Sequence, residues 1–162
     1  SKWRWNRCQF TERSLLDPKN NFREEGLTEL VDKVIVADIT NLPYENKYFD
    51  FMISHGVLDS MPFNIARSGL LEISRCLKDK GKIYFDLISE HGYICSDENF
   101  EKTITTNHEK NTIQTCFNKD RINSLIDGIF NITEIVLKTE KNLQNDFIHG
   151  RYHIVVEKIL NE

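Results

Sequence analysis

The chain has 162 residues, of which 40% are hydrophobic and 10% aromatic, and its formal net charge is −4. This composition is typical of a globular domain with a hydrophobic core, and it excludes a disordered chain. The acidic balance gives no case for a nucleic-acid or membrane partner, and no stretch reaches the roughly 20 apolar residues of a membrane span. We therefore expect a cytoplasmic protein.

The spacing of cysteine and histidine gives no case for a metal site. His149 and His153 have H-x-x-x-H spacing, but their segment has the pattern of a loop followed by a strand, and no third ligand is obvious. Four cysteines lie far apart and form no C-x-x-C motif, which predicts free thiols in a reducing compartment. These cysteines are Cys8, Cys76, Cys95 and Cys116.

The N-terminal residues give the weakest pattern. Residues 2–7 alternate basic and aromatic side chains, which suits an edge strand or the start of an amphipathic helix and which can also stack on nucleic acid. Residues 22–31 predict a helix with apolar groups on one face, although Gly26 weakens this prediction.

Two short apolar runs follow, and each leads into polar or small residues. Residues 34–37 predict a buried parallel strand that ends at Asp38. Residues 49–54 predict a second strand, which ends at the segment 54–56. Ligands bind outside the carboxyl ends of the strands in open α/β sheets, so we expect a site at these positions.

A strand–helix–strand unit continues from the second run. Residues 63–78 carry apolar groups at helical spacing and predict a helix. Asn64 or Ser60 is the candidate cap, and we expect Gly81 to end the helix. The apolar run at 83–88 predicts the next strand, and the short connection implies a right-handed parallel crossover.

The pattern changes between residues 89 and 117. Threonine-rich segments at 103–106 and 112–117 flank a polar loop, which predicts a β-hairpin inserted at the carboxyl edge of the sheet. A lid or a substrate wall would lie at this edge. The remaining predicted elements are a helix at 119–126 and an antiparallel hairpin formed by strands 130–136 and 152–158.

In this order and spacing, the segments resemble the class I S-adenosylmethionine-dependent methyltransferases. The matching segments are Ala37-Asp38-Ile39, Leu42-Pro43-Tyr44, Tyr48-Phe49-Asp50-Phe51, residues 54–59, residues 72–78, residues 81–84 and the closing strands at 130–136 and 152–158. The resemblance implies an α/β fold with a Rossmann-like methyltransferase sheet, mostly parallel, with a C-terminal antiparallel hairpin. We expect residues 1–162 to form a single, partial domain with an atypical N-terminal segment (1–20) and an inserted hairpin or lid (89–117).

The resemblance also implies cofactor contacts. In the family, the acid after the third strand accepts a hydrogen bond from the adenine amino group, and the next backbone N–H meets a ring nitrogen, which gives Asp38 and Ile39. Residues after the fourth strand line the methionine side, which gives Ser54, His55 and Gly56. The alternative for Asp38 is a role in a local turn. His55 is a weak candidate for a general base, and its alternative is a packing or backbone contact.

One part of the family pattern is missing. The chain has no Gly-x-Gly-x-Gly loop, and only 33 residues precede Val34, too few for the family's first two strands with their helices. We therefore expect only the adenine side of the cofactor site to be represented. In the family order 3-2-1-4-5-7-6 this leaves a gap of two strands. Residues 1–20, a second copy in a homodimer or direct pairing of the flanking strands would fill the gap, unless the chain, which starts at Ser1, is truncated. A vestigial first strand at 15–18 is a further alternative.

Three functions are compatible with these patterns. The first is methyl transfer from S-adenosylmethionine to an unidentified small-molecule acceptor, with this chain alone inactive if it is a fragment. The second is a degenerate methyltransferase fold that serves as a non-catalytic binding or dimerisation module. The third is an unrelated Rossmann-like reductase, whose own glycine fingerprint is equally absent. We favour the first.

Overall fold

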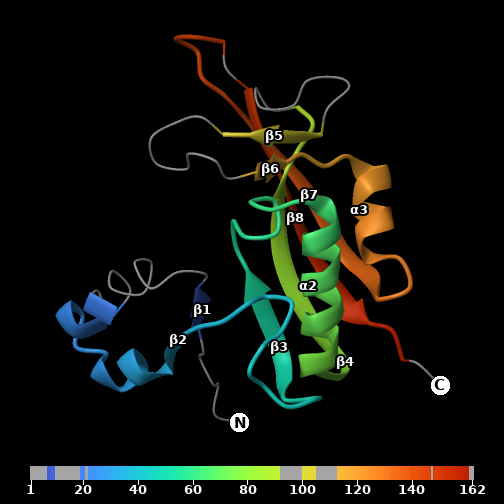
Figure 1. The fold of residues 1–162 in the computed structure, drawn as a ribbon. Helices are drawn as coiled ribbons and strands as arrows, with labels where there is room; N and C mark the ends of the chain where they lie inside the picture. Colours follow the sequence, from blue (N-terminus) through green and yellow to red (C-terminus); the bar gives the residue numbers. More distant parts are fainter. Residues whose placement is uncertain are drawn as a thin grey trace. The chain divides into compact units, whose positions relative to one another are not determined.

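The computed structural model in Figure 1 describes residues 7–9, 19–20, 22–91, 100–104, 113–146 and 148–160. The predictions for residues 2–6, the vestigial strand at 15–18 and the polar loop at 107–111 lie outside the described residues. The chain divides into two compact units, residues 1–43 and 44–162. Within the described residues, no helix is long and apolar enough to cross a membrane.

The first unit contains a short parallel sheet. β1 (Arg7–Gln9) pairs with β2 (Val34–Val36), and Arg7 lies opposite Val34. β2 is the strand predicted at 34–37. Val34 is buried, as predicted, but Val36 is exposed, so the prediction of a buried strand is wrong at that position. β1 comes from the segment 1–20, so this segment provides a parallel neighbour for β2.

The helix predicted at 22–31 is wrong in its second half. Residues 22–24 are helical, but Gly26 has a φ of 72°, and the amide of Leu27 donates a hydrogen bond to the carbonyl of Phe22 at 2.7 Å. This is the Schellman arrangement, which ends a helix at a glycine in the left-handed conformation. A 3-10 helix, η1 (Thr28–Lys33), then leads into β2.

The second unit contains a four-stranded sheet in the order β3-β4-β8-β7. β3 is parallel to β4, whereas β8 is antiparallel to both β4 and β7. This order is the 4-5-7-6 part of the family's sheet, so the predicted Rossmann-like fold with a C-terminal antiparallel hairpin is confirmed. The strands are β3 (Phe49–Ser54), β4 (Leu77–Ile88), β7 (Phe130–Lys141) and β8 (Ile148–Lys158).

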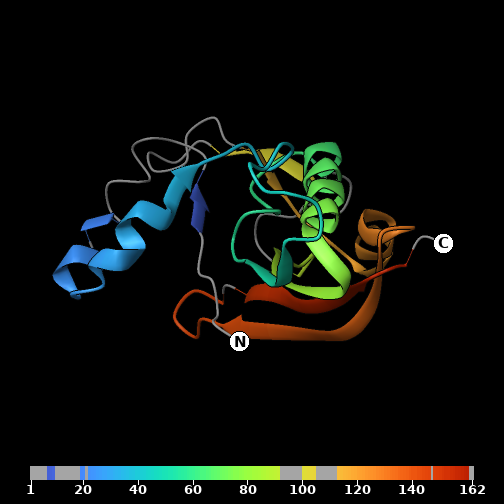
Figure 2. The ribbon, with the colours of Figure 1, turned by 90° about the horizontal axis from the view of Figure 1, so that it is seen from below.

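Two helices, α2 (Phe63–Cys76) and α3 (Lys119–Ile126), lie on the same side of this sheet (Figure 2). The guanidinium of Arg67 in α2 joins them, because it donates to the carbonyls of Ser124 and Leu125 at 2.8 and 2.9 Å. Both helices were predicted, and their apolar faces enter the core. The fully buried side chains of the second unit include Leu70, Ile83, Phe85, Leu87, Ile122, Leu125, Ile154 and Val156.

The start of α2 is capped by a side chain that is distant in sequence. Neither Asn64 nor Ser60 caps the helix, so that prediction is wrong. The amide of Phe63 instead donates to Oε1 of Glu101 at 2.9 Å. Ser60 is engaged elsewhere, because its hydroxyl donates to the carbonyl of Gly56 at 3.2 Å.

The end of α2 also differs from the prediction. The helix ends at Cys76 and β4 begins at the next residue, so Gly81 does not end the helix. Gly81 lies within β4, where the register against β3 shifts. A Cβ at this position would lie 2.8 Å from the carbonyl oxygen of Lys78, which explains why the strand has a glycine there.

The inserted hairpin is attached to the carboxyl end of β4. β5 (Glu101–Thr103) and β6 (Ile113–Thr115) form the predicted antiparallel pair. After β6, the amide of Phe117 donates to the carbonyl of Ile88 at 2.9 Å, and the amide of Glu90 donates to the carbonyl of Phe117 at 2.9 Å. The hairpin therefore starts and ends beside the edge where the site was predicted.

Cys116, directly after β6, is disulfide-bonded, so the prediction of free thiols is wrong at this position. Cys76 is a buried free thiol, as predicted. Cysteines far apart in a sequence can meet in the fold, and their spacing alone therefore does not exclude a bridge.

Candidate functional site

The candidate site lies at the carboxyl ends of the parallel strands β3 and β4. Ser54 ends β3 and pairs with Phe85 of β4. The segment after Ser54 therefore begins beside the C-terminal residues of β4. Asp86 lies in this part of β4 and is fully buried. A buried carboxylate is costly unless its oxygens accept hydrogen bonds, and the neighbouring residues provide them.

Asp86 accepts two hydrogen bonds and makes one further close contact, with a histidine. Its Oδ1 accepts from the backbone amide of Gly56 at 2.7 Å. Its Oδ2 accepts from Nε of Arg151 at 2.9 Å and lies 2.8 Å from Nδ1 of His55. The structure therefore brings together two predicted site residues, His55 and Gly56, around an aspartate that the sequence analysis did not select.

Arg151 connects Asp86 to a second buried carboxylate. Its Nη2 donates to Oδ2 of Asp59 at 2.7 Å, and the same oxygen accepts from the amide of Ile88 at 3.0 Å. Burial raises the pKa of Asp59 above its usual value, and the positive charge of Arg151 opposes this shift. We call His55, Asp59, Asp86 and Arg151 the ionic network.

Three members of the ionic network were not predicted from the sequence: Asp59, Asp86 and Arg151. A signal was present for Asp86, because it interrupts the otherwise uncharged strand Tyr84-Phe85-Asp86-Leu87-Ile88. A charge inside a buried strand requires a partner or a function. No comparable signal marked Arg151, which lies 65 positions from Asp86 in the sequence.

His55 is the most exposed member of the ionic network, with 74% of its side chain accessible. The carboxylate of Asp86 can only accept hydrogen bonds, so Nδ1 of His55 carries the hydrogen. In the neutral imidazole, Nε2 then holds a free lone pair. This arrangement can accept a proton from a molecule at the edge of the sheet.

The residues on either side of His55, Ser54 and Gly56, offer an unpartnered hydroxyl and open space. The hydroxyl of Ser54 is buried and has no hydrogen-bond partner within the described part of the chain. Gly56 has a φ of 64°, and a Cβ there would meet no atom within 4 Å. An unpartnered buried hydroxyl is rare in proteins, so its partner can be a ligand or a water molecule.

Asp38 and Ile39 belong to the first unit, where they form a local turn. Oδ1 of Asp38 accepts from the amide and the hydroxyl of Thr40 at 2.8 and 2.7 Å, and these bonds lower the pKa of Asp38. The amide of Asn41 donates to the carbonyl of Asp38 at 3.0 Å. The local turn that was the alternative for Asp38 is thus present. Asp38 is exposed and Ile39 is buried, and a cofactor role for both stays a prediction.

His153 of β8 lies next to the ionic network. It is opposite Asp86 in β4, and Oη of Tyr84 lies 2.7 Å from its Nδ1. Burial lowers the pKa of His153, and the positive charge of Lys138 acts in the same direction. Among the residues that the structure describes, no group of three or more His, Cys, Asp or Glu side chains could hold a metal ion.

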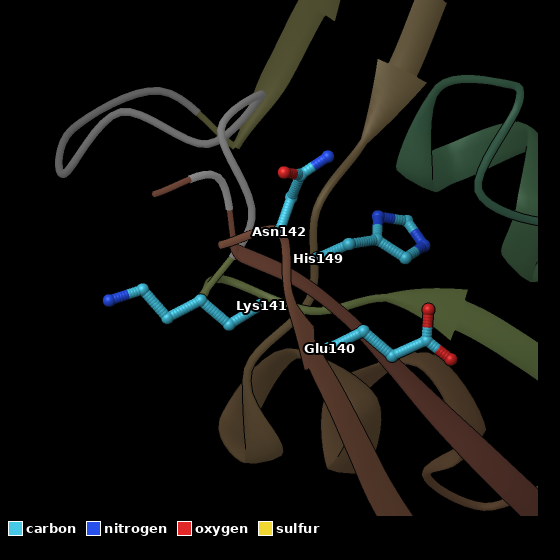
Figure 3. Close-up of a pocket in the computed structure, with 4 residues that line it drawn as sticks. All are labelled: Glu140, Lys141, Asn142 and His149. Carbon is cyan, nitrogen blue, oxygen red and sulfur yellow. The ribbon is translucent and has the colours of Figure 1, made fainter. Parts of the chain in front are cut away.

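A separate pocket lies at the end of the β7–β8 hairpin (Figure 3). It is lined by Glu140, Lys141, Asn142 and His149. Glu140 and His149 are cross-strand neighbours whose side chains extend to the same side, while Lys141 extends to the other. β8 runs antiparallel to β4, so the start of β8 lies at the carboxyl end of β4, the end that carries the ionic network.

Comparison with known proteins agrees with this architecture. Residues 8–85 match the family model described as a methyltransferase domain. A solved S-adenosylmethionine-dependent methyltransferase from Methanosarcina mazei is similar over 95% of this chain and 81% of its own, with 17% identity and a TM-score of 0.74. A second such methyltransferase, from Clostridium acetobutylicum, is similar over 93% of this chain and 73% of its own, with 16% identity and a TM-score of 0.64. Geranyl diphosphate methyltransferase in complex with SAM is similar over 94% of this chain and 67% of its own, with 10% identity and a TM-score of 0.61.

The search of curated proteins found no match. The family match and the fold together confirm the predicted resemblance to the class I, Rossmann-like methyltransferases. At identities of 10–17%, the solved structures establish the fold, and they leave the acceptor to be argued from the site.

Proposed function

We propose that this chain is an S-adenosylmethionine-dependent methyltransferase in which His55 is the general base for a small-molecule acceptor. One observation carries the proposal: the 2.8 Å contact between Nδ1 of His55 and the buried carboxylate of Asp86 at the carboxyl edge of the sheet. A buried carboxylate that fixes the tautomer of an exposed imidazole is the arrangement that general-base catalysis needs.

Each of the two units, considered by itself, offers candidate contacts for the cofactor. Asp38 is exposed and its pKa is lowered, so it offers an anionic acceptor for the adenine amino group, with the apolar Ile39 beside it. The unpartnered hydroxyl of Ser54 and the open space at Gly56 suit a polar ligand group near the methionine end. S-adenosylmethionine, when bound, supplies an electrophilic methyl group on its sulfonium.

His55 supplies the proton transfer. Asp86 and its partners hold the imidazole by Nδ1, and Nε2 accepts the proton from a hydroxyl or amine of the acceptor. Asp86 itself is fixed by Gly56 and Arg151 and is not exposed to solvent. This fixed geometry positions the base before the acceptor arrives.

Cofactor binding is the first test. Isothermal titration with S-adenosylhomocysteine should show binding by the wild-type chain and an affinity loss of about tenfold or more in Asp38→Ala, the scale expected for a lost charge-assisted hydrogen bond. Asp50→Ala removes another exposed aspartate and is the matched control. Ser54→Ala should also weaken binding without loss of stability, because its hydroxyl bonds to no described residue. Equal affinities in all four proteins would contradict the proposed cofactor contacts.

The base is tested separately. With a panel of small hydroxyl and amine acceptors, His55→Gln should lower the rate of S-adenosylhomocysteine release by roughly 100-fold, a typical contribution of a general base. Its unfolding midpoint should stay unchanged, because His55 is mostly exposed. Its affinity for S-adenosylhomocysteine, measured in parallel, separates the loss of the base from the loss of a cofactor contact. An unchanged rate would exclude His55 as the base while leaving the methyltransferase function intact.

A non-catalytic binding module of the same fold is the alternative function. The sequence supports this alternative because it has no Gly-x-Gly-x-Gly segment for the methionine end of the cofactor. A folded wild-type chain that does not bind S-adenosylhomocysteine would favour the module. Binding that depends on Asp38 would favour the enzyme.

A further inference from the structure

The strand β7 is an unprotected edge of the sheet. It is the last strand in the order β3-β4-β8-β7, and no described segment pairs with its outer side. All its residues after Phe130 are exposed, and the apolar side chains of Ile135, Val136 and Leu137 are between 36 and 40% accessible. Long edge strands with exposed apolar side chains pair readily with another strand, and monomeric proteins usually avoid them.

The sequence of this edge is complementary to itself. Residues 133–139 read Thr-Glu-Ile-Val-Leu-Lys-Thr. Residues at equal distances on either side of Val136 are both aliphatic, of opposite charge, or both threonine. If a second copy of β7 pairs antiparallel with Val136 opposite Val136, Glu134 lies opposite Lys138 and Ile135 lies opposite Leu137. Opposite charges and apolar pairs in direct cross-strand positions stabilise a sheet, whereas like charges destabilise it.

The faces of the sheet agree with this register. In the pairing with β8, Glu134, Val136 and Lys138 lie opposite Val155, His153 and Arg151, on one face. Ile135 and Leu137 lie opposite Ile154 and Tyr152, on the other face. A two-fold axis through Val136, perpendicular to the sheet, keeps each residue on its own face. Every matched pair therefore meets on a common side.

Other registers do not match both the charged and the apolar side chains. A centre at Thr139, for example, pairs Lys138 with Glu140 but places Leu137 opposite Lys141. A centre at Ile135 places Glu134 opposite Val136, and a centre at Leu137 places Val136 opposite Lys138. Centres at Glu134 or Lys138 bring like charges together. The β-bulge between Ile132 and Glu134 interrupts the regular strand at one end of the matched segment. The complementarity thus selects a single alignment.

The charged pair has no competing partner within the described residues. Neither Glu134 nor Lys138 forms an ion pair there, and Lys138 lies opposite the like-charged Arg151 of β8. A Glu134 from a second copy would provide the missing negative charge beside Lys138. The symmetry supplies this contact twice.

We propose that β7 is the interface of a two-fold homodimer, in which the β7 strands of two copies pair antiparallel about Val136 and join the two sheets into one. The partner is a second copy of this chain. This interface uses the edge of the sheet opposite to β3, and it does not depend on the proposed methyltransferase function.

Charge reversal tests the alignment. In sedimentation velocity the wild-type chain should be a dimer, and Glu134→Lys or Lys138→Glu should each weaken the dimer by about tenfold or more, because two favourable pairs become two like-charge pairs. The double variant Glu134→Lys/Lys138→Glu should restore the dimer, since the pairs are then reversed. Glu140→Lys makes the same charge change on the same strand outside the matched segment and should have little effect.

A wild-type chain that stays monomeric would overturn the proposal. A dimer that neither single reversal weakens would also overturn it, as would a double variant that dissociates as far as the single variants. Circular dichroism and urea unfolding of each variant establish that it is folded; lysine is tolerated on edge strands, so we expect no loss of fold.

Discussion

Asp38 and Asp86 lie at the carboxyl ends of parallel strands in the two units, and they are held in contrasting ways. Asp38 is exposed and bonds to Thr40, two positions along the chain. Asp86 is fully buried and bonds to Gly56 and Arg151, which are 30 and 65 positions away. The environment of Asp38 forms whenever the local turn forms, whereas the environment of Asp86 forms only when β4, β8 and the segment after β3 are assembled. We therefore expect substitutions at the two sites to separate ligand binding from stability.

The largest effect should come from Asp86→Asn. Among the described residues, removing this charge leaves the partly buried guanidinium of Arg151 with Asp59 as its one remaining charged partner. Breaking a buried ion pair costs roughly 3 kcal/mol. Urea unfolding should show this loss in the free energy of unfolding. Asp50→Asn, which changes an exposed aspartate, should leave the midpoint nearly unchanged. Comparable midpoints for both variants would mean that the ionic network does not stabilise the sheet.

Arg151→Met should make stability depend on pH. Without the cation, the pKa of Asp59, already raised by burial, rises further. The folded state then binds a proton more readily than the unfolded state, so the stability of the variant should increase as the pH falls from about 8 towards 4. Thermal unfolding of the variant and the wild type across this range measures the difference. A constant difference between them would contradict the role assigned to Asp59.

Gly56→Ala should have an intermediate effect. The φ of 64° is left-handed, which costs a residue with a Cβ about 1 kcal/mol, and no neighbouring atom adds a clash. The loss should appear in urea unfolding. Gly128→Ala is a matched control for strain alone, because Gly128 has a φ of 70° and also open space around it. A much larger loss at Gly56 would show that the contact with Asp86 is disturbed as well.

The smallest effect should come from Thr40→Val. The variant loses the hydroxyl bond to Asp38 but keeps the backbone bond, and both lie in solvent, where water replaces a lost partner. Neither the unfolding midpoint nor the affinity for S-adenosylhomocysteine should change measurably. A marked loss of affinity would show that the turn, and not only the charge of Asp38, prepares this site.

The same contrast explains what the sequence could predict. Strands β3, β4, β7 and β8 and helices α2 and α3 have regular apolar periods, and these are local properties. The helix break at Gly26 was visible as a weakness, but the Schellman bonds that make it were not. The ionic network depends on residues from three separate elements, so no local pattern defines it. Likewise, the cap of α2 comes from Glu101, 38 positions after Phe63.

The bond from Glu101 to the amide of Phe63 joins the β5–β6 hairpin to the first turn of α2. An N-terminal amide without its cap is open to solvent, so each release of the β5–β6 hairpin would expose the first turn of α2. Hydrogen exchange of that turn would then report the opening of the hairpin, although the helix itself stays folded. In Glu101→Gln the amide of Phe63 should exchange faster, and the end of α2 at Cys76 should be unaffected.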